Sequence, residues 1–364
     1  MPTALPSASP TLAAVAAHLG VSRTTVSNAY NRPDQLSPAL RERVLDAARE
    51  LGYAGPDPMA RSLRRGRAGS FGFVFDHPLR YVFDDPAAVL FLAGVAAGCE
   101  EQGTGLALLP QMPEGAAEVV RSALVDGYIM FCTPEDDERL GAVIARGLPY
   151  ALVDYSPSVP GPHVNVDDRG GAQAVAQHLI DLGHRRVALA LPPSDRDDEA
   201  AGRLIPLSTE DLWAPDLPGA QPRWRWFICH ERLVGWRTAL ERAAVDLATI
   251  PVATAPRGAG DPGHAAAAQL LDRAERPTAI VCQSDALALG ALRAARERGI
   301  RVPQDLSVVG FDDIGEAATT GLTTIRQPHG GKGEAAVSLL TGGGNDVVLP
   351  TQLVVRSTSG PVPS

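Results

Sequence analysis

The chain has 364 residues, a formal net charge of −9 and a mean hydropathy of −0.02. This length is too great for one compact core and predicts two or three domains. An apolar content of 45% is typical of a globular protein, and no apolar run is long enough to cross a membrane. Residues 1–10 lack the charged-then-apolar pattern of a signal peptide. We therefore expect a cytoplasmic protein with no membrane partner.

The charge is unevenly distributed along the chain. Residues 1–69 contain nine arginines and five acidic residues, a net charge of +4, which leaves −13 for the rest. A basic head attracts a polyanion such as DNA, while an acidic body is repelled by it. The charge pattern therefore favours a nucleic-acid-binding N-terminal domain.

Residues 11–31 predict two short helices joined by a tight turn. Thr11 is a candidate N-cap, Gly20 suits a left-handed turn position, and Ser22 can cap the second helix. This pattern is typical of a helix-turn-helix, whose second helix reads bases in the major groove. A helical hairpin with a solvated polar face is the alternative interpretation of these residues alone.

The second helix is expected to present polar side chains outward. Arg23 can form two hydrogen bonds to guanine, Asn28 can do so to adenine, and Thr24 can contact a thymine methyl group. The candidate DNA-binding residues of this segment are Thr11, Ser22, Arg23, Thr24, Thr25, Ser27, Asn28 and Asn31.

A third helix is predicted from Ser37, its N-cap, to Gly52. The Pro-, Gly- and Arg-rich residues that follow are either a flexible basic linker or, over 58–65, a short helix. In such a helix Leu63 can enter the minor groove while Arg61 contacts phosphate. A helix this short should form only on DNA.

From Phe71 onward, short apolar runs alternate with helical patterns, and the alternation restarts after residue 165. Buried strands separated by helices predict parallel sheets covered on both faces. We expect an α/β core of two Rossmann-like subdomains, with a ligand site at the carboxyl ends of the strands.

Nothing specific in the sequence supports catalysis. The four cysteines, at irregular spacing, are expected to be reduced thiols rather than disulfides or a metal site. A GxGxxG pattern at 258–263 lies in the middle of the second unit, so a glycine-rich turn is favoured over a dinucleotide site. We expect no enzymatic activity, no cofactor and no metal.

Several strings together resemble the lac-repressor (LacI/GalR) family of bacterial transcriptional regulators over about residues 11–360. They are GVSRTTVSNAYN, SPALRERVLDAARELGY, ARSLRRGR, HLIDLGHRRVALA, ERLVGWRTAL, SDALALGALRAARERGIRVPQDLSVVGFDDI and LTTIRQP. The resemblance implies an all-α helix-turn-helix domain, a hinge helix and a periplasmic-binding-protein-like core. It also implies a ligand-controlled homodimer that binds a palindromic DNA operator, most often a repressor released by a sugar. A corepressor-type regulator of a nucleobase-like ligand and a solute-binding protein without a DNA role are the alternatives.

The resemblance also implies domain boundaries. The helix-turn-helix domain would span 1–54 and the hinge 55–69. The N-terminal core subdomain would comprise 70–166 and 328–344, and the C-terminal subdomain 167–327 and 345–364. The chain would then cross between the subdomains three times. Because no heptad repeat follows VVRSTSG (354–360), we expect a dimer rather than a coiled-coil tetramer.

Five effector-binding residues are implied by the resemblance: Asp76, Asp154, Arg232, Ser284 and Asp312. An arginine with several carboxylates can make oriented hydrogen bonds to a polyol. Alternatively, Arg232 is a surface cation and Asp312 caps a turn.

Two features depart from the family pattern. Asn28 stands where arginine is common, which predicts a preference for adenine over guanine at that contact. An insertion at about 192–230 contains Trp213, Trp224 and Trp226. These tryptophans either contribute an aromatic face to the ligand site or pack together as a surface flap.

Overall fold

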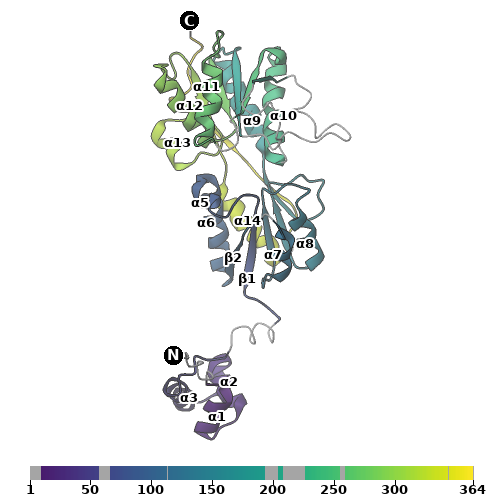
Figure 1. Cartoon of the computed structure of the whole chain (residues 1–364), viewed down its shortest axis with the longest axis vertical. Coiled ribbons are helices and arrows are strands. Elements are labelled where there is room, and N and C mark those ends of the chain that lie inside the picture. Colours follow the sequence, from purple (N-terminus) through teal and green to yellow (C-terminus); the bar gives the residue numbers. More distant parts are fainter. Residues whose placement is uncertain are drawn as a thin grey trace, which may run out of the picture. The chain divides into compact units, whose positions relative to one another are not determined.

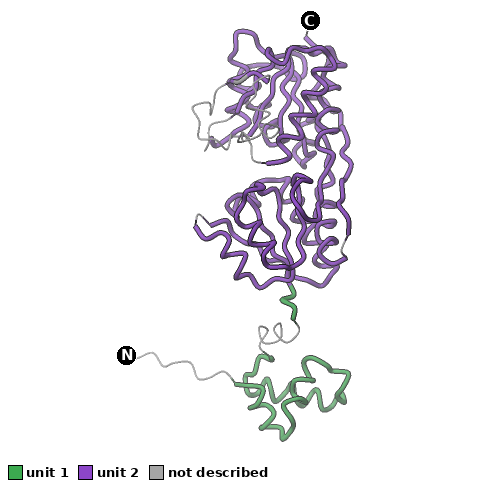
Figure 2. The backbone as a smooth tube through the Cα atoms, turned by 90° about the vertical axis from the view of Figure 1, so that its right-hand side faces the viewer, with its two compact units in different colours: residues 1–69 green, residues 70–364 purple. Residues whose placement is uncertain are grey.

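The computed structural model describes residues 10–56, 66–112, 114–192, 204–207, 226–254, 259–342 and 344–363. The chain forms two compact units, residues 1–69 and residues 70–364 (Figure 2). Arg61 and Leu63 of the expected hinge, and Trp213 and Trp224 of the insertion, lie outside the described residues. In the part of the chain that is described, no helix is long and apolar enough to cross a membrane.

The first unit is a small helical domain. Its elements are α1 (Leu12–Leu19), α2 (Arg23–Asn31), the 3-10 turn η1 (Pro33–Gln35) and α3 (Pro38–Glu50). Each α-helix contributes one fully buried valine to a shared core: Val15, Val26 and Val44. Gly20 has a φ of 66° and ends α1, which confirms the predicted left-handed turn between the first two helices.

The second unit begins with the parallel sheet whose strands β1 and β2 are labelled in Figure 1. It has six strands in the order β12-β5-β4-β3-β1-β2. Its strands are β1 (Ser70–Phe75), β2 (Gly105–Leu109), β3 (Tyr128–Phe131), β4 (Tyr150–Val153), β5 (His163–Val166) and β12 (Val347–Leu349). Phe71, Phe73 and Phe75 pack on one face, under α6 (Pro86–Glu101) and α14 (His329–Gly342). The other face packs against α7 (Ala116–Ser122) and α8 (Glu138–Arg146). The short helix α5 (Tyr81–Asp84) precedes α6.

The second sheet has the order β10-β9-β6-β8-β7, and only β7 runs antiparallel to its neighbour. Its strands are β6 (Val187–Leu191), β7 (Ile205–Pro206), β8 (Pro251–Thr254), β9 (Ala279–Cys282) and β10 (Ser307–Val309). One face packs on α9 (Asp168–Asp181) and α10 (Phe227–Arg242), and the other on α11 (Pro262–Leu271) and α12 (Asp285–Glu297). The short elements η3 (Leu247–Thr249) and α13 (Gly315–Thr320) lie in the connections. The two parallel α/β layers confirm the predicted fold class.

The expected boundary at residue 345 needs a correction. β12 adds to β5 in the first sheet, so the chain leaves that sheet only after Leu349. It then forms β13 (Gln352–Val354), which pairs with β11 (Thr324–Arg326) in a separate antiparallel ribbon against α9. The sequence signal is weak because β12 is a three-residue edge strand whose central residue, Val348, is exposed.

Helix α14 approaches α6 closely through glycines. A Cβ on Gly94 would overlap the carbonyl group of Gly330, and one on Gly333 would overlap the backbone of Phe91. This close packing holds α14 against the first sheet and fixes the position of Lys332, which α14 carries.

Candidate DNA interface and effector site

Some candidate DNA-binding residues serve as helix caps. Thr11 Oγ1 accepts a hydrogen bond from the backbone N–H of Ala14, and Ser22 Oγ accepts one from the N–H of Thr25 at 3.0 Å. Ser22 Oγ also lies 2.8 Å from Thr25 Oγ1. These bonds fix the starts of α1 and α2, so they orient the second helix whether or not the same side chains touch DNA.

The remaining polar residues of α2 fall into two groups. Arg23 and Thr24 are exposed on its first turn, and within the described residues their side chains make no hydrogen bond. Asn28 Nδ2 donates to Gln35 Oε1 at 3.3 Å, and Asn31 Nδ2 donates to Ser27 O and Oγ. The first-turn side chains are therefore available to a groove, whereas the two amides are already oriented by neighbours.

In the core, four of the five expected effector residues follow the carboxyl ends of strands. Asp76 follows β1 and Asp154 follows β4 in the first sheet, while Ser284 and Asp312 follow β9 and β10 in the second. Arg232 is on α10. Asp154 and Asp312 have φ angles of 63° and 134°, which are uncommon for residues with a side chain and concentrate at functional sites.

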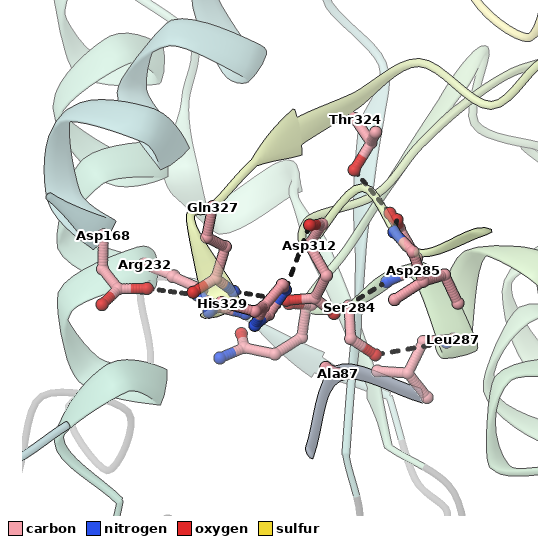
Figure 3. Close-up of polar contacts among 12 residues, drawn as sticks. Ala87, Asp168, Arg232, Ser284, Asp285, Leu287, Asp312, Thr324, Gln327 and His329 are labelled. Carbon is pink, nitrogen blue, oxygen red and sulfur yellow. Dashed lines mark hydrogen bonds and ion pairs between the residues drawn. The ribbon is translucent and has the colours of Figure 1, made fainter. Parts of the chain in front are cut away.

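Arg232 lies at the centre of a buried polar network (Figure 3). Its Nε donates to Asp168 Oδ1 at 2.7 Å, and its NH1 donates to the backbone carbonyl of Gln283 at 2.6 Å. The guanidinium carbon lies 3.8 Å from the centre of the Phe311 ring. With a relative exposure of 3%, Arg232 is not a surface cation.

Asp312 joins this network from the other side (Figure 3). Its Oδ1 accepts a hydrogen bond from Gln327 Nε2 at 2.5 Å and lies 3.8 Å from Arg232 NH1. Its backbone carbonyl lies 3.1 Å from His329 Nε2. Burial raises the pKa of Asp312 well above its usual value, although Arg232 opposes this shift. The carboxyl group therefore resists ionisation.

Asp154 is neutralised by the only lysine of the chain. Lys332 Nζ donates to both carboxylate oxygens of Asp154, at 2.8 and 3.1 Å, and both side chains are almost completely buried. Lys332 comes from α14, about half the chain away in sequence from β4. The pair joins two distant segments of the first subdomain.

Asp76 forms a contact between the two subdomains. Trp226, the residue before α10, donates its indole N–H to Asp76 Oδ2 at 3.0 Å. The Trp226 ring also stacks on His77, which stacks in turn on Tyr81. The described part of the insertion thus places one tryptophan against the first subdomain.

Ser284 has a structural role in this network. Its Oγ accepts a hydrogen bond from the N–H of Leu287 and caps α12. The preceding residue, Gln283, has a relative exposure of 4%, and among the described residues neither polar atom of its side-chain amide has a hydrogen-bond partner. The available polar group after β9 therefore belongs to Gln283.

Sequence reasoning missed several members of the network. They are Asp85, Asp168, Gln283, Asp285, Gln327, His329 and Lys332. The single lysine in an arginine-rich chain was the one available signal. The other residues are recognisable only once distant segments come together.

Carboxylates outnumber cations in this region. Asp168 and Asp285 each have a pKa raised to about 6, mainly by burial, and burial also raises the pKa of Asp85. Asp168 is bound to Arg232, and Asp154 to Lys332, so each cation already has an acidic partner. Asp285 accepts hydrogen bonds from Thr324 Oγ1 and the N–H of Ile314.

Comparison with known proteins agrees with this architecture. Residues 11–55 match the family of bacterial regulatory proteins, lacI family, and residues 227–359 match a periplasmic binding protein-like domain. An HTH-type transcriptional regulator of Mycolicibacterium smegmatis is 41% identical, over 96% of this chain and 96% of its own length. The structure of the CelR–cellobiose complex is 30% identical, with a TM-score of 0.64, and the match covers 96% of this chain and 99% of that chain. The lac repressor dimer bound to operator and the anti-inducer ONPF is 26% identical, with a TM-score of 0.73 and the same coverage.

A helix-turn-helix head followed by two parallel α/β layers defines a DNA-binding transcriptional regulator with a periplasmic-binding-protein-like core. The chain belongs to the lacI family of bacterial regulatory proteins.

Replacing Lys332 with methionine should strongly destabilise the core, because it leaves the buried carboxylate of Asp154 without its cation. We expect urea unfolding to show a loss of about 3–5 kcal/mol. The double variant Lys332→Met/Asp154→Asn should recover much of this loss. Arg301→Met, which breaks the exposed Arg301–Asp305 pair, is the control and should change little. A single variant as stable as the wild type would contradict a structural role for the buried pair.

His329 should make stability depend on pH. Burial, with a contribution from Lys332, lowers the pKa of His329 from 6.5 to about 3, so the folded protein holds this ring neutral. As the pH falls below 6.5, His329 is protonated in the unfolded chain but not in the folded protein, which favours unfolding. The folded state therefore loses stability as the pH falls from about 6.5 toward 3. Between pH 7 and pH 5, wild type should lose about 2 kcal/mol more unfolding free energy than His329→Gln. Parallel pH profiles for the two proteins would contradict this assignment.

Proposed function

We propose that the chain is a repressor that binds a palindromic operator as a homodimer and is released by a small neutral ligand, most simply a sugar. The observation that supports this most strongly is the combination, in one chain, of a helix-turn-helix with exposed first-turn side chains and a core with a buried polar network at its strand ends. The CelR–cellobiose complex and the operator-bound lac repressor dimer are consistent with the two halves of the proposal. A regulator of this kind would act in the cytoplasm and would need neither catalysis nor a cofactor.

Base reading is assigned to Arg23, Thr24 and Asn28. Arg23 and Thr24 are exposed at the N-terminal end of α2, the part of a recognition helix that contacts base edges. The remaining candidates would support this helix and contact the phosphate backbone of the DNA. They are Thr11, Ser22, Thr25, Ser27 and Asn31. Arg61 and Leu63 are assigned to phosphate and minor-groove contacts on the basis of sequence alone.

Exposed apolar side chains on α5 and α6 support the dimer. Tyr81 and Phe83 on α5, and Val89 and Leu90 on α6, have relative exposures of 40–59%. Neighbouring large apolar side chains on one surface often mark a contact with another protein chain. A second copy of this chain is the occupant that a two-fold symmetric operator requires.

The charges of the core favour a ligand without negative charge. Arg232 and Lys332 are already bound to Asp168 and Asp154, so an anionic group would face surplus carboxylates with no unpaired cation among these residues. Hydroxyl groups can both donate and accept hydrogen bonds, which suits the unpaired amide of Gln283 and the carboxyl group of Asp312. Asp76 and Ser284 complete the set of candidate contacts.

A corepressor with a nucleobase-like ring is the second candidate. The amide of Gln283 also matches the adjacent donor and acceptor of a base edge, and the stacked rings of His77 and Trp226 are suited to a planar ligand. In either case the ligand controls DNA binding only if it binds the DNA-competent and DNA-incompetent conformations with different affinities.

Selection of the full-length protein on randomised DNA tests the DNA-binding half of the proposal. We expect a two-fold symmetric consensus, and Arg23→Ala/Asn28→Ala should reduce base preference by roughly tenfold or more at the contacted positions of each half-site. Arg43→Ala, an exposed arginine on α3, controls for the loss of positive charge and should weaken all sequences alike. An asymmetric consensus would contradict the dimer, and an unchanged consensus would contradict the base contacts.

Thermal denaturation with matched ligands tests the effector half. The panel comprises neutral mono- and disaccharides, cyclic polyols, glucose 6-phosphate, adenine and hypoxanthine. We expect a neutral sugar or polyol to stabilise the protein and to weaken operator binding. Gln283→Leu should weaken ligand binding roughly tenfold without lowering the stability of the free protein, because within the described part of the chain the amide makes no hydrogen bond that the change would remove. Gln269→Leu, which removes a hydrogen bond to Thr254 O, is the control and should leave ligand affinity unchanged.

Other results of this panel distinguish the alternatives. Stronger stabilisation by glucose 6-phosphate than by glucose would contradict the charge argument. Stabilisation by a purine, together with tighter operator binding, would favour the corepressor.

A further inference from the structure

The side-chain amide of Asn28 is held by a residue outside the recognition helix. Asn28 Nδ2 donates to Gln35 Oε1, and Gln35 is the last residue of η1, the turn that follows α2. None of the sequence patterns that point to DNA binding includes Gln35.

The turn that carries Gln35 is itself anchored. The backbone N–H of Gln35 donates to Arg32 O at 3.0 Å, and the N–H of Leu36 donates to Pro33 O. Leu36 packs against the helical core of the first unit. Arg41 on α3 also donates to Ala29 O near the end of α2. Gln35 is therefore held at a defined position beside the recognition helix.

This contact determines which way the Asn28 amide is turned. Adenine presents an acceptor, N7, and a donor, the N6 amino group, side by side in the major groove. A half-turn of the amide exchanges its oxygen and nitrogen and destroys the match. In the structure Gln35 presents Oε1, which can accept only from the nitrogen, so this contact stabilises the orientation in which Nδ2 of Asn28 faces η1. Nδ2 carries two hydrogens, so one remains for a base after the bond to Gln35 is made.

We propose that Gln35 is a positioning residue that pre-orients the Asn28 amide for adenine and so contributes to operator specificity. The proposal rests on the assignment of Asn28 as a base-reading residue. Gln35 acts through Asn28 and touches no base itself. Its effect falls on one base pair of each half-site and not on overall affinity.

The test compares full-length variants in the same DNA selection, followed by binding measurements on single-base operator variants. Asn28→Ala identifies the base position that this side chain reads. Gln35→Met keeps the size of the side chain but removes the acceptor, and Gln35→Glu keeps an acceptor. We expect Gln35→Met to reduce the preference for adenine at that position by roughly two- to fivefold, because the amide must then be ordered on binding. Preferences at the other positions should not change.

Gln35→Glu distinguishes a specific effect on the Asn28 position from a general effect of folding or charge on DNA affinity. Its added negative charge should weaken binding to all sequences alike, while the preference at the Asn28 position is at least as strong as in wild type, because a carboxylate can only accept from the amide nitrogen. If Asn28→Ala changes that preference and Gln35→Met does not, the positioning role of Gln35 is wrong and the base contact stands. If Asn28→Ala changes no base preference, both assignments are wrong. Equal losses at every position in Gln35→Met would also overturn the positioning role.

Discussion

The core depends on balancing buried carboxylates with too few cations. Arg232 and Lys332 each bind one aspartate, while Asp85, Asp285 and Asp312 must be accommodated by hydrogen bonds and raised pKa values. Burying an unpaired charge costs several kcal/mol. The network is therefore stable only while its ion pairs and hydrogen bonds stay in place. A ligand hydroxyl can donate to the side-chain oxygens of Gln283 and Gln327, which accept no hydrogen bond from the described residues. This favours a neutral polar ligand over an anion.

The network also includes one of the segments that pass between the two subdomains. Gln327 follows β11, in the ribbon on α9, and His329 is the first residue of α14, which packs on the first sheet. Both are bonded to Asp312, and α14 carries Lys332, which is bonded to Asp154. Trp226 and Asp76 add a second contact between the subdomains. A group that binds beside Asp312 therefore touches residues whose positions depend on how the subdomains are arranged.

Features that depend on local sequence were predictable. Helix caps such as Thr11 and Ser22, the turn at Gly20 and the apolar strands each depend on a few neighbouring residues. The positions of Asp76, Asp154 and Asp312 at strand ends followed from the α/β pattern and the family resemblance. The partners of Asp154 and Asp76 could not be predicted in this way. Lys332 and Trp226 are far from these aspartates in sequence and contact them only in the folded chain. The resemblance places β12 in the other subdomain, and a three-residue edge strand leaves almost no periodic signal that could correct this boundary.

The polar side chains of the helix-turn-helix domain fall into two groups: some stabilise the fold and others are exposed. Ser22 and Thr25 bond to each other, and Asn31 bonds back to Ser27, so these side chains stiffen α2. Arg23 and Thr24 remain exposed, and a flexible arginine loses conformational entropy when it binds. An amide already held in one orientation loses less. A recognition helix that combines one adaptable arginine with one pre-oriented amide can gain affinity from the first and discrimination from the second.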